Sequence, residues 1–150
     1  MACHLRGGQA PKTREFNNEQ NRVFGLFIEG DNSNIQGLIL IQEREPNQLI
    51  HISLMEAAPY NQFNNPHQEY ASVGKVLLAF AMNYSLNIQR FEGYVGLEAK
   101  RNYNEDFYLK LNAQLANLIN GKPYYFFSDT DGSINHLKKY LPGGVNICPS

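Results

Sequence analysis

The sequence contains only two cysteines, Cys3 and Cys148, and they do not form a Cys-x-x-Cys pair. A disulfide between them is geometrically open, but two isolated cysteines in a chain of 150 residues favour a reducing compartment. No apolar run approaches the roughly 20 residues that a membrane helix needs. The first residues do not resemble a signal peptide either. We therefore expect a cytoplasmic protein that has no membrane as partner.

The chain also lacks an excess of charge of either sign. Its net charge is -1 and its pI is about 6.4, which gives no electrostatic reason to expect a nucleic acid or an anionic surface as partner. Hydrophobic residues make up 43% and charged residues 18%, as is usual for soluble globular proteins. A length of 150 residues predicts one domain.

Several motifs of catalytic and metal sites are missing. The four histidines are scattered without the spacing of metal ligands, so we expect structural or surface roles for them and no metal. The segment Val73-Gly74-Lys75 lacks both the upstream glycine and the following Ser or Thr of a phosphate-binding loop of the Walker type. Ser53 and Ser85 lack the Gly-x-Ser-x-Gly context of a nucleophile.

Three strands are predicted in the first half of the chain. Residues 1–20 are polar and are expected to form a flexible N-terminal arm. Apolar patterns predict strands at 22–29, 35–43 and 49–58, and the short turns between them predict an antiparallel meander. In the third strand, alternation places Ile50, Ile52 and Leu54 on one face and His51, Ser53 and Met55 on the other.

The second half predicts alternating helices and strands. Val73, Val76, Leu77, Phe80 and Tyr84 recur on one face of a helix that is expected to run to about Arg90. A strand at 93–99 then makes a parallel crossover with the third strand. A helix from Asn102 or Asn104 through Asn117, a strand at 124–127, a helix ending at Leu141 and a tail at 142–150 complete the chain. The predicted class is α/β (α+β), with a mixed central sheet in which the meander is followed by β-α-β-α-β-α.

Gly74 lies inside the first turn of the long helix, where glycine costs ~0.5–1 kcal/mol relative to alanine. Two explanations remain open. A ligand with a phosphate group approaches the bare backbone N–H groups at the helix N-terminus, where the helix dipole favours anions. Alternatively, the glycine serves a tight turn from strand to helix, or close packing of the helix on a sheet.

Two segments of the chain resemble motifs of the GCN5-related N-acetyltransferases (GNAT), and the resemblance covers residues 21–141. The family pattern Gln/Arg-x-x-Gly-x-Gly/Ala, which holds the CoA pyrophosphate on backbone amides, reads here Glu69-x-x-Ser72-x-Gly74. Glu69 thus places a negative charge where the family prefers Gln or Arg. The segment 106–113 is similar to the family's Phe-Tyr-x-Lys-Leu-Gly-Phe, with Asn112 in the place of Gly and Ala113 in the place of Phe.

The resemblance implies an acyl-CoA N-acyltransferase-like domain at 21–141 that transfers an acyl group from acetyl-CoA to an amine acceptor, whose identity cannot be read. It implies Tyr108 as the acid for the departing thiolate and Glu56 as the base, directly or through a water. A core tyrosine and a plain surface glutamate are the open alternatives. The implied cofactor-binding residues are Leu54, Met55, Ala57, Tyr70, Ala71, Ser72, Val73, Gly74, Lys75 and Asn102. Lys110 contacts the phosphate or adenine end of the cofactor or is simply solvated.

The family usually opens with a strand and two helices that build part of the acceptor wall, and 20 polar residues cannot hold them. The degraded motif and the missing wall support an alternative, a non-catalytic GNAT-like module that binds CoA or a protein. In a further variant a second copy supplies the wall, which predicts a homodimer.

Overall fold

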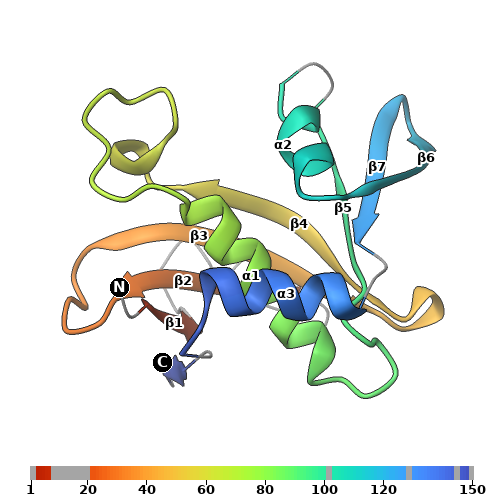
Figure 1. Cartoon of the computed structure of the whole chain (residues 1–150), viewed down its shortest axis with the longest axis horizontal. Helices are drawn as coiled ribbons and strands as arrows, with labels where there is room; N and C mark the ends of the chain where they lie inside the picture. The colour runs from red at the N-terminus through yellow and green to blue at the C-terminus, as the bar shows by residue number, and fades with distance from the viewer. Residues whose placement is uncertain (1–2, 8–20, 101–102, 128–129, 144–145, 149–150) are drawn as a thin grey trace.

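One mixed sheet organises the molecule, with strand order β6-β7-β5-β4-β3-β2-β1-β8 (Figure 1). The computed structural model describes residues 3–7, 21–100, 103–127, 130–143 and 146–148. The strands are β1 (Cys3–Gly7), β2 (Asn21–Ile28), β3 (Ile35–Arg44), β4 (Leu49–Ala57), β5 (Val95–Glu98), β6 (Gln114–Ile119), β7 (Lys122–Phe127) and β8 (Asn146–Cys148). The helices are α1 (Val73–Leu86), α2 (Glu105–Lys110) and α3 (Thr130–Tyr140), and short 3-10 turns lie at Glu45–Asn47 and Pro59–Asn61. The predicted fold class is confirmed.

The meander formed by β2, β3 and β4 is antiparallel, as predicted. Its first turn is stabilised by Asp31, whose Oδ1 accepts the N–H of Ser33 at 3.0 Å, and by Gly30 with φ of 84°. Short polar residues and glycine close this hairpin because they bond their own backbone or tolerate positive φ.

The chain ends are more regular than the sequence indicates. Within the segment expected to be a flexible arm, Cys3–Gly7 forms β1 and pairs with β2, while 8–20 lies outside the described residues. Within the expected tail, Asn146–Cys148 forms β8 and pairs in parallel with β1. The register sets Cys148 opposite Arg6. Cys3 is therefore about 10 Å further along β1 at the usual rise per strand residue, which is too far for a disulfide.

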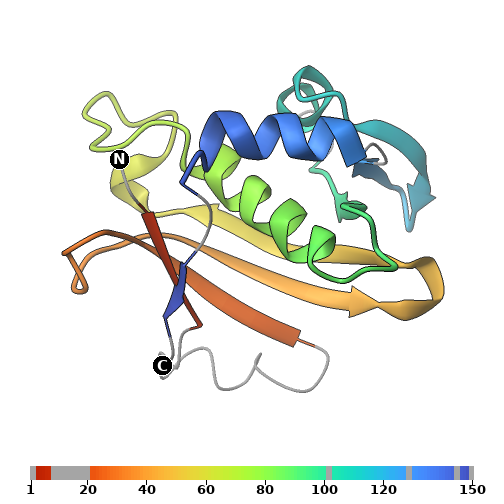
Figure 2. The same cartoon turned by 60° about the horizontal axis from the view of Figure 1, so that its bottom comes forward.

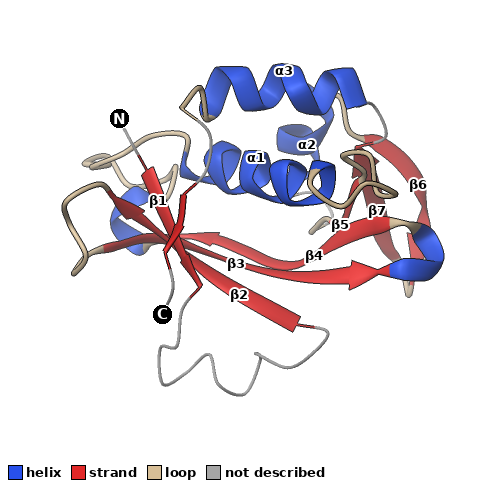
Figure 3. Cartoon of the chain, turned by 90° about the horizontal axis from the view of Figure 1, so that it is seen from below, coloured by secondary structure: helices blue, strands red, loops and turns tan. Residues whose placement is uncertain are grey.

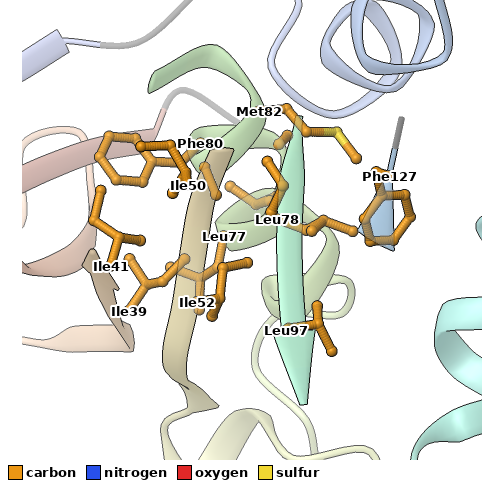
Figure 4. Packing of buried hydrophobic residues seen from close by; sticks show 14 of the residues in the cluster. Ile39, Ile41, Ile50, Ile52, Leu77, Leu78, Phe80, Met82, Leu97 and Phe127 are labelled. Atoms are coloured by element: carbon orange, nitrogen blue, oxygen red, sulfur yellow. The ribbon is translucent and has the colours of Figure 1, made fainter. Parts of the chain in front are cut away.

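Helices α1 and α3 lie on one face of the sheet, with α1 directly on it (Figure 3). Leu77, Leu78 and Phe80 of α1 are fully buried and pack with strand residues such as Ile39 and Ile50 (Figure 4). Each such side chain contributes about 1.5–3 kcal/mol through burial. The crossover from β4 through α1 to β5 is parallel, as predicted. In the part of the chain that the structure describes, no helix has the length and apolar character required to cross a bilayer.

The prediction of one helix through Asn117 is wrong. Helix α2 ends at Lys110 because Asn112 adopts a left-handed conformation with φ of 65°. The N–H of Ala113 then bonds the Tyr108 carbonyl, which closes the helix end. Asn120 and Gly121 follow with φ of 50° and 77°, the signature of a tight hairpin turn between β6 and β7. The dipeptide Asn-Gly was the available signal, and the leucine spacing concealed it.

A buried histidine lies on the sheet face opposite α1. His51 Nδ1 is 3.0 Å from the hydroxyl of Tyr124, and the two rings stack. The tyrosine reaches across Gly96, where an added Cβ would lie 2.2 Å from the Tyr124 hydroxyl. Burial, and second the charge of Arg44, lower the pKa of His51 to about 4. The folded protein therefore holds this histidine in its neutral form at neutral pH.

We expect His51 to make stability depend on pH. Because the pKa of His51 is lowered on folding, the unfolded chain binds a proton below its ordinary value of 6.5. Stability is fully present above that value and falls as pH drops toward the folded value of about 4, by roughly 3 kcal/mol. Urea unfolding of the native protein and of His51→Gln at pH 7 and at pH 4.5 measures this. The advantage of the native protein over the variant shrinks at the lower pH; an advantage independent of pH contradicts the assignment.

Candidate functional site

Strands β4 and β5 separate soon after they meet. Their parallel register contains only the pairs Ile50–Val95, His51–Gly96 and Ile52–Leu97, yet β4 continues to Ala57. Figure 1 shows the two strands diverging toward α2. Among the described residues, the far half of β4 therefore has no strand partner on its β5 side.

A bulge at Ser53 decides which groups of β4 face this opening. Leu40 pairs with Leu54, whereas Ile41 pairs with Ile52, so one residue of β4 is extra. A bulge shifts the alternation of every residue that follows. Met55 consequently packs toward α1 with Ala57, while Leu54 is 49% exposed on the other face. The predicted faces of Leu54 and Met55 are thus wrong.

The backbone direction follows from the same register. The N–H of Ile50 donates to Tyr94, so it points toward β5. Alternation, corrected for the bulge, turns the N–H groups of Met55 and Ala57 toward the opening and that of Leu54 toward β3. Of the three β4 residues predicted to contact the cofactor, Met55 and Ala57 can therefore offer a main-chain N–H donor in the opening, and Leu54 cannot.

The N-terminus of α1 has no side-chain cap. Ser72 adopts a left-handed conformation with φ of 66° and makes no capping bond with its side chain. The first helical bond runs from the N–H of Val76 to the Ser72 carbonyl. The N–H groups of Val73, Gly74 and Lys75 thus lack helical partners. Ala71 and Ser72, which directly precede these donors, are small and exposed.

Close packing does not explain Gly74. A Cβ added there would meet only Phe107, at 3.6 Å, which is an ordinary contact. The glycine that lets α1 approach the sheet is Gly37 of β3. A Cβ at that position would lie 2.8 Å from a methyl group of Val73 and 2.9 Å from the Glu56 carbonyl. Of the two explanations for Gly74, packing on the sheet is therefore the weaker.

Helix α2 brings Tyr108 into the same core cluster as Val73 and Val76 of α1. Its ring is 6% exposed and meets Phe107 edge-on at 5.2 Å. Burial raises the pKa of Tyr108 to about 12. The hydroxyl therefore stays protonated at neutral pH and can only donate a proton, not remove one.

The charged candidates occupy different places. Glu56 of β4 is exposed, on the face opposite α1. The N–H of Glu69 bonds the Tyr60 carbonyl. Burial raises the pKa of Tyr60, and the negative charge of Glu69 raises it further. The Lys75 ammonium lies 5.6 Å from the ring centre of Tyr140 in α3. Asn102 lies outside the described residues.

The sequence reasoning missed the pair that holds the loop before α1. Asn61 is 3% exposed and Gln36 is 2% exposed. The Asn61 amide donates to Gln36 Oε1 at 2.7 Å, and its Oδ1 accepts the N–H of Tyr70 at 2.9 Å. This bond ties the half-buried Tyr70, a predicted cofactor contact, to β3. No local sequence pattern predicts the Asn61–Gln36 pair, because the two residues lie 25 positions apart in the chain. Within the described ranges, no three acidic, histidine or cysteine side chains gather as metal ligands would.

Comparison with solved structures identifies the fold of this chain. A chimera of the spermidine N-acetyltransferase SpeG from Vibrio cholerae and hSSAT matches with a TM-score of 0.62, at 13% identity, over 91% of this chain and 99% of that chain. The chain has the GNAT fold. PaiA N-acetyltransferase from Thermoplasma acidophilum, in complex with coenzyme A, matches with a TM-score of 0.51 at 13% identity, over 79% of this chain and 66% of that chain.

A third GNAT structure, nourseothricin acetyltransferase, matches with a TM-score of 0.52 at 18% identity. The match covers 72% of this chain and 64% of that one, which is less than two thirds of its length. No protein-family model matches the sequence, and no curated protein matches it. Identities this low establish the fold alone.

We expect Asn61→Ala to lower the free energy of unfolding by about 2 kcal/mol, because it leaves buried Gln36 and the Tyr70 N–H without their partner. Urea unfolding measures the change. Asn64→Ala, at an exposed position of the same loop, is the control and should stay within about 0.5 kcal/mol of the native protein. Equal effects of the two variants would show that the pair does not anchor the loop.

Proposed function

We propose that this protein is an acyl-CoA-dependent N-acetyltransferase that acts on an amine. The observation that carries the proposal is the opening between β4 and β5 beside the uncapped start of α1. The opening suits a narrow pantetheine arm, and the helix start suits a pyrophosphate, since backbone N–H groups and the helix dipole favour anions. The GNAT fold supports the same placement.

Acetyl-CoA supplies an acyl group activated as a thioester. In the proposed mechanism the N–H groups of Met55 and Ala57 bind the pantetheine arm and polarise the acyl oxygen. The hydroxyl of Tyr108 stays protonated because burial raises its pKa to about 12, and it gives its proton to the departing thiolate sulfur. Glu56 removes a proton from the attacking amine, directly or through a water, on the exposed face of β4.

The alternative is a GNAT-like module that binds CoA without catalysis. It rests on two departures from the motif, the acidic Glu69 and the strained Ser72. The two functions differ in one outcome, because both bind CoA but only the enzyme releases its thiol when an amine is supplied.

Gly74→Ala tests whether the N–H groups at the start of α1 bind the pyrophosphate of the cofactor. We expect the variant to be more stable by up to ~1 kcal/mol, because alanine is the better helix former. We also expect about tenfold weaker binding of acetyl-CoA, since a methyl group hinders the approach of a phosphate to the N–H groups. Calorimetry with acetyl-CoA and urea unfolding measure the two effects.

Gly143→Ala is the matched control, because a Cβ there meets nothing within 4 Å. It should leave the affinity unchanged. Absence of binding by the native protein at millimolar acetyl-CoA would end the proposed function.

Tyr108→Phe tests the chemistry. The ring remains packed, so the Kd for CoA should not change, while kcat should fall about a hundredfold through loss of the proton donor. Thiol release with a panel of primary amines measures kcat. Tyr84→Phe is the control, because burial also raises the pKa of Tyr84 to about 12 but its hydroxyl bonds Glu43, far from the opening. A full rate in Tyr108→Phe would exclude the tyrosine as the acid.

A further inference from the structure

Strand β6 is the longer of the two edges of the sheet. Its six residues pair with β7 on one side, and in the described part of the chain no strand lies on the other side. The opposite edge, β8, has three residues. In Figure 2 the β6–β7 hairpin lies at the end of the molecule away from β1 and β8. The outer N–H and C=O groups of β6 are therefore free to pair with a further strand.

The side chains that usually discourage such pairing are absent from β6. Exposed edges are normally short, or they carry Lys or Pro. The strand reads Gln-Leu-Ala-Asn-Leu-Ile and contains no charged residue and no proline. Five of its six residues are exposed, and Ile119 is half-buried. The strand is therefore suited to a partner strand.

A bulge places the two leucines of β6 on the same face of the sheet. Leu115 pairs with Tyr125 of β7. Leu118 pairs with Pro123, only two positions away, so β6 contains one extra residue. In a regular strand, positions three apart face opposite sides, and the bulge removes that difference. Because Tyr125 belongs to the buried cluster that α1 covers, both leucines lie on the helical face, yet they are 56% and 60% exposed.

The absence of charge favours a second copy of this chain as the partner. A two-fold axis sets each residue near it against its own copy, and like charges placed opposite each other destabilise a strand pair. A strand that pairs with itself must therefore be uncharged near the axis, as β6 is. A partner selected by charge would need a complementary charge on β6, and the strand has none.

We propose that β6 pairs with β6 of a second copy, so that the two sheets become continuous across a two-fold axis. This axis makes the two strands antiparallel. Centred between Ala116 and Asn117, it sets Leu115 of each copy opposite Leu118 of the other, and both leucines become covered. The sequence predicts a homodimer from the missing acceptor wall. The present inference locates an interface instead, and it holds whatever reaction the chain performs.

Sedimentation and hydrogen exchange of the native protein test the inference. We expect a mass of about 34 kDa at about 100 µM, which is twice the 17.1 kDa of one chain. The amide groups of β6 that point away from β7 should exchange at least about tenfold more slowly at that concentration than in dilute solution, because they are then hydrogen bonded. A mass of 17.1 kDa at about 100 µM would overturn the inference and leave the edge to a strand of another protein.

Leu118→Lys tests the place of the interface. It sets a charge beside the axis, where the charge meets that of the other copy, so the Kd of the dimer should rise at least about tenfold. Because the position is exposed, the variant should unfold in urea as the dissociated native protein does.

Leu54→Lys is the matched control, because Leu54 is also an exposed leucine, at 49%, but lies on β4 inside the sheet. It should leave the mass of the dimer unchanged. Equal effects of the two variants, or a dimer whose β6 amides exchange as fast as in dilute solution, would overturn the inference. Both readouts are independent of acyl transfer, so that result would leave the proposed function standing.

Discussion

The short parallel pairing of β4 with β5 is the constraint on which the rest of the structure depends. Three residue pairs hold the two halves of the sheet together before the strands part. Had the pairing continued, the N–H groups of Met55 and Ala57 would bond β5, and no donor would face a ligand. The bulge at Ser53 bends β4 at the point of separation, and α2 inserts Phe107 and Tyr108 against α1 on the helical side of the sheet. The candidate site is the consequence of that separation.

Local sequence patterns predicted the fold well where the apolar residues of an element recur at the spacing of a single strand or helix. The meander and the buried face of α1 were predicted from the spacing of apolar residues, because that spacing places them together on the side that is buried. The helix expected through Asn117 failed because leucines at 111, 115 and 118 imitate helical spacing in a segment broken by two positive-φ sites. Leu115 and Leu118 are in fact 56% and 60% exposed on β6, the edge of the sheet. The turns formed at Asn112 and at Asn120-Gly121 therefore decide the structure of this segment, and the helical spacing of its leucines does not.

The candidate site was less predictable because its decisive features are not local. Alternation could not reveal the bulge that exchanges the faces of Leu54 and Met55. The buried Asn61–Gln36 pair depends on how the hairpin meets the loop, and the bare start of α1 depends on an exposed Ser72 with positive φ. Sequence reasoning did name Gly74 and Tyr108, because both lie in motifs whose spacing is intact.

The departures from the family motif are easier to understand on this geometry. Ser72 holds the left-handed conformation that glycine adopts freely, at a strain of about 1–2 kcal/mol, so the path of the backbone into α1 does not need the glycine. The N–H of Glu69 bonds the Tyr60 carbonyl, while the ammonium groups of Lys75 and Lys139 lie 5.6 Å and 5.3 Å from the ring centre of Tyr140. Positive charge is thus supplied from α1 and α3 instead of from position 69. In the proposed function the phosphate is bound by main-chain N–H groups, and these donors do not depend on which residue carries the positive charge beside them.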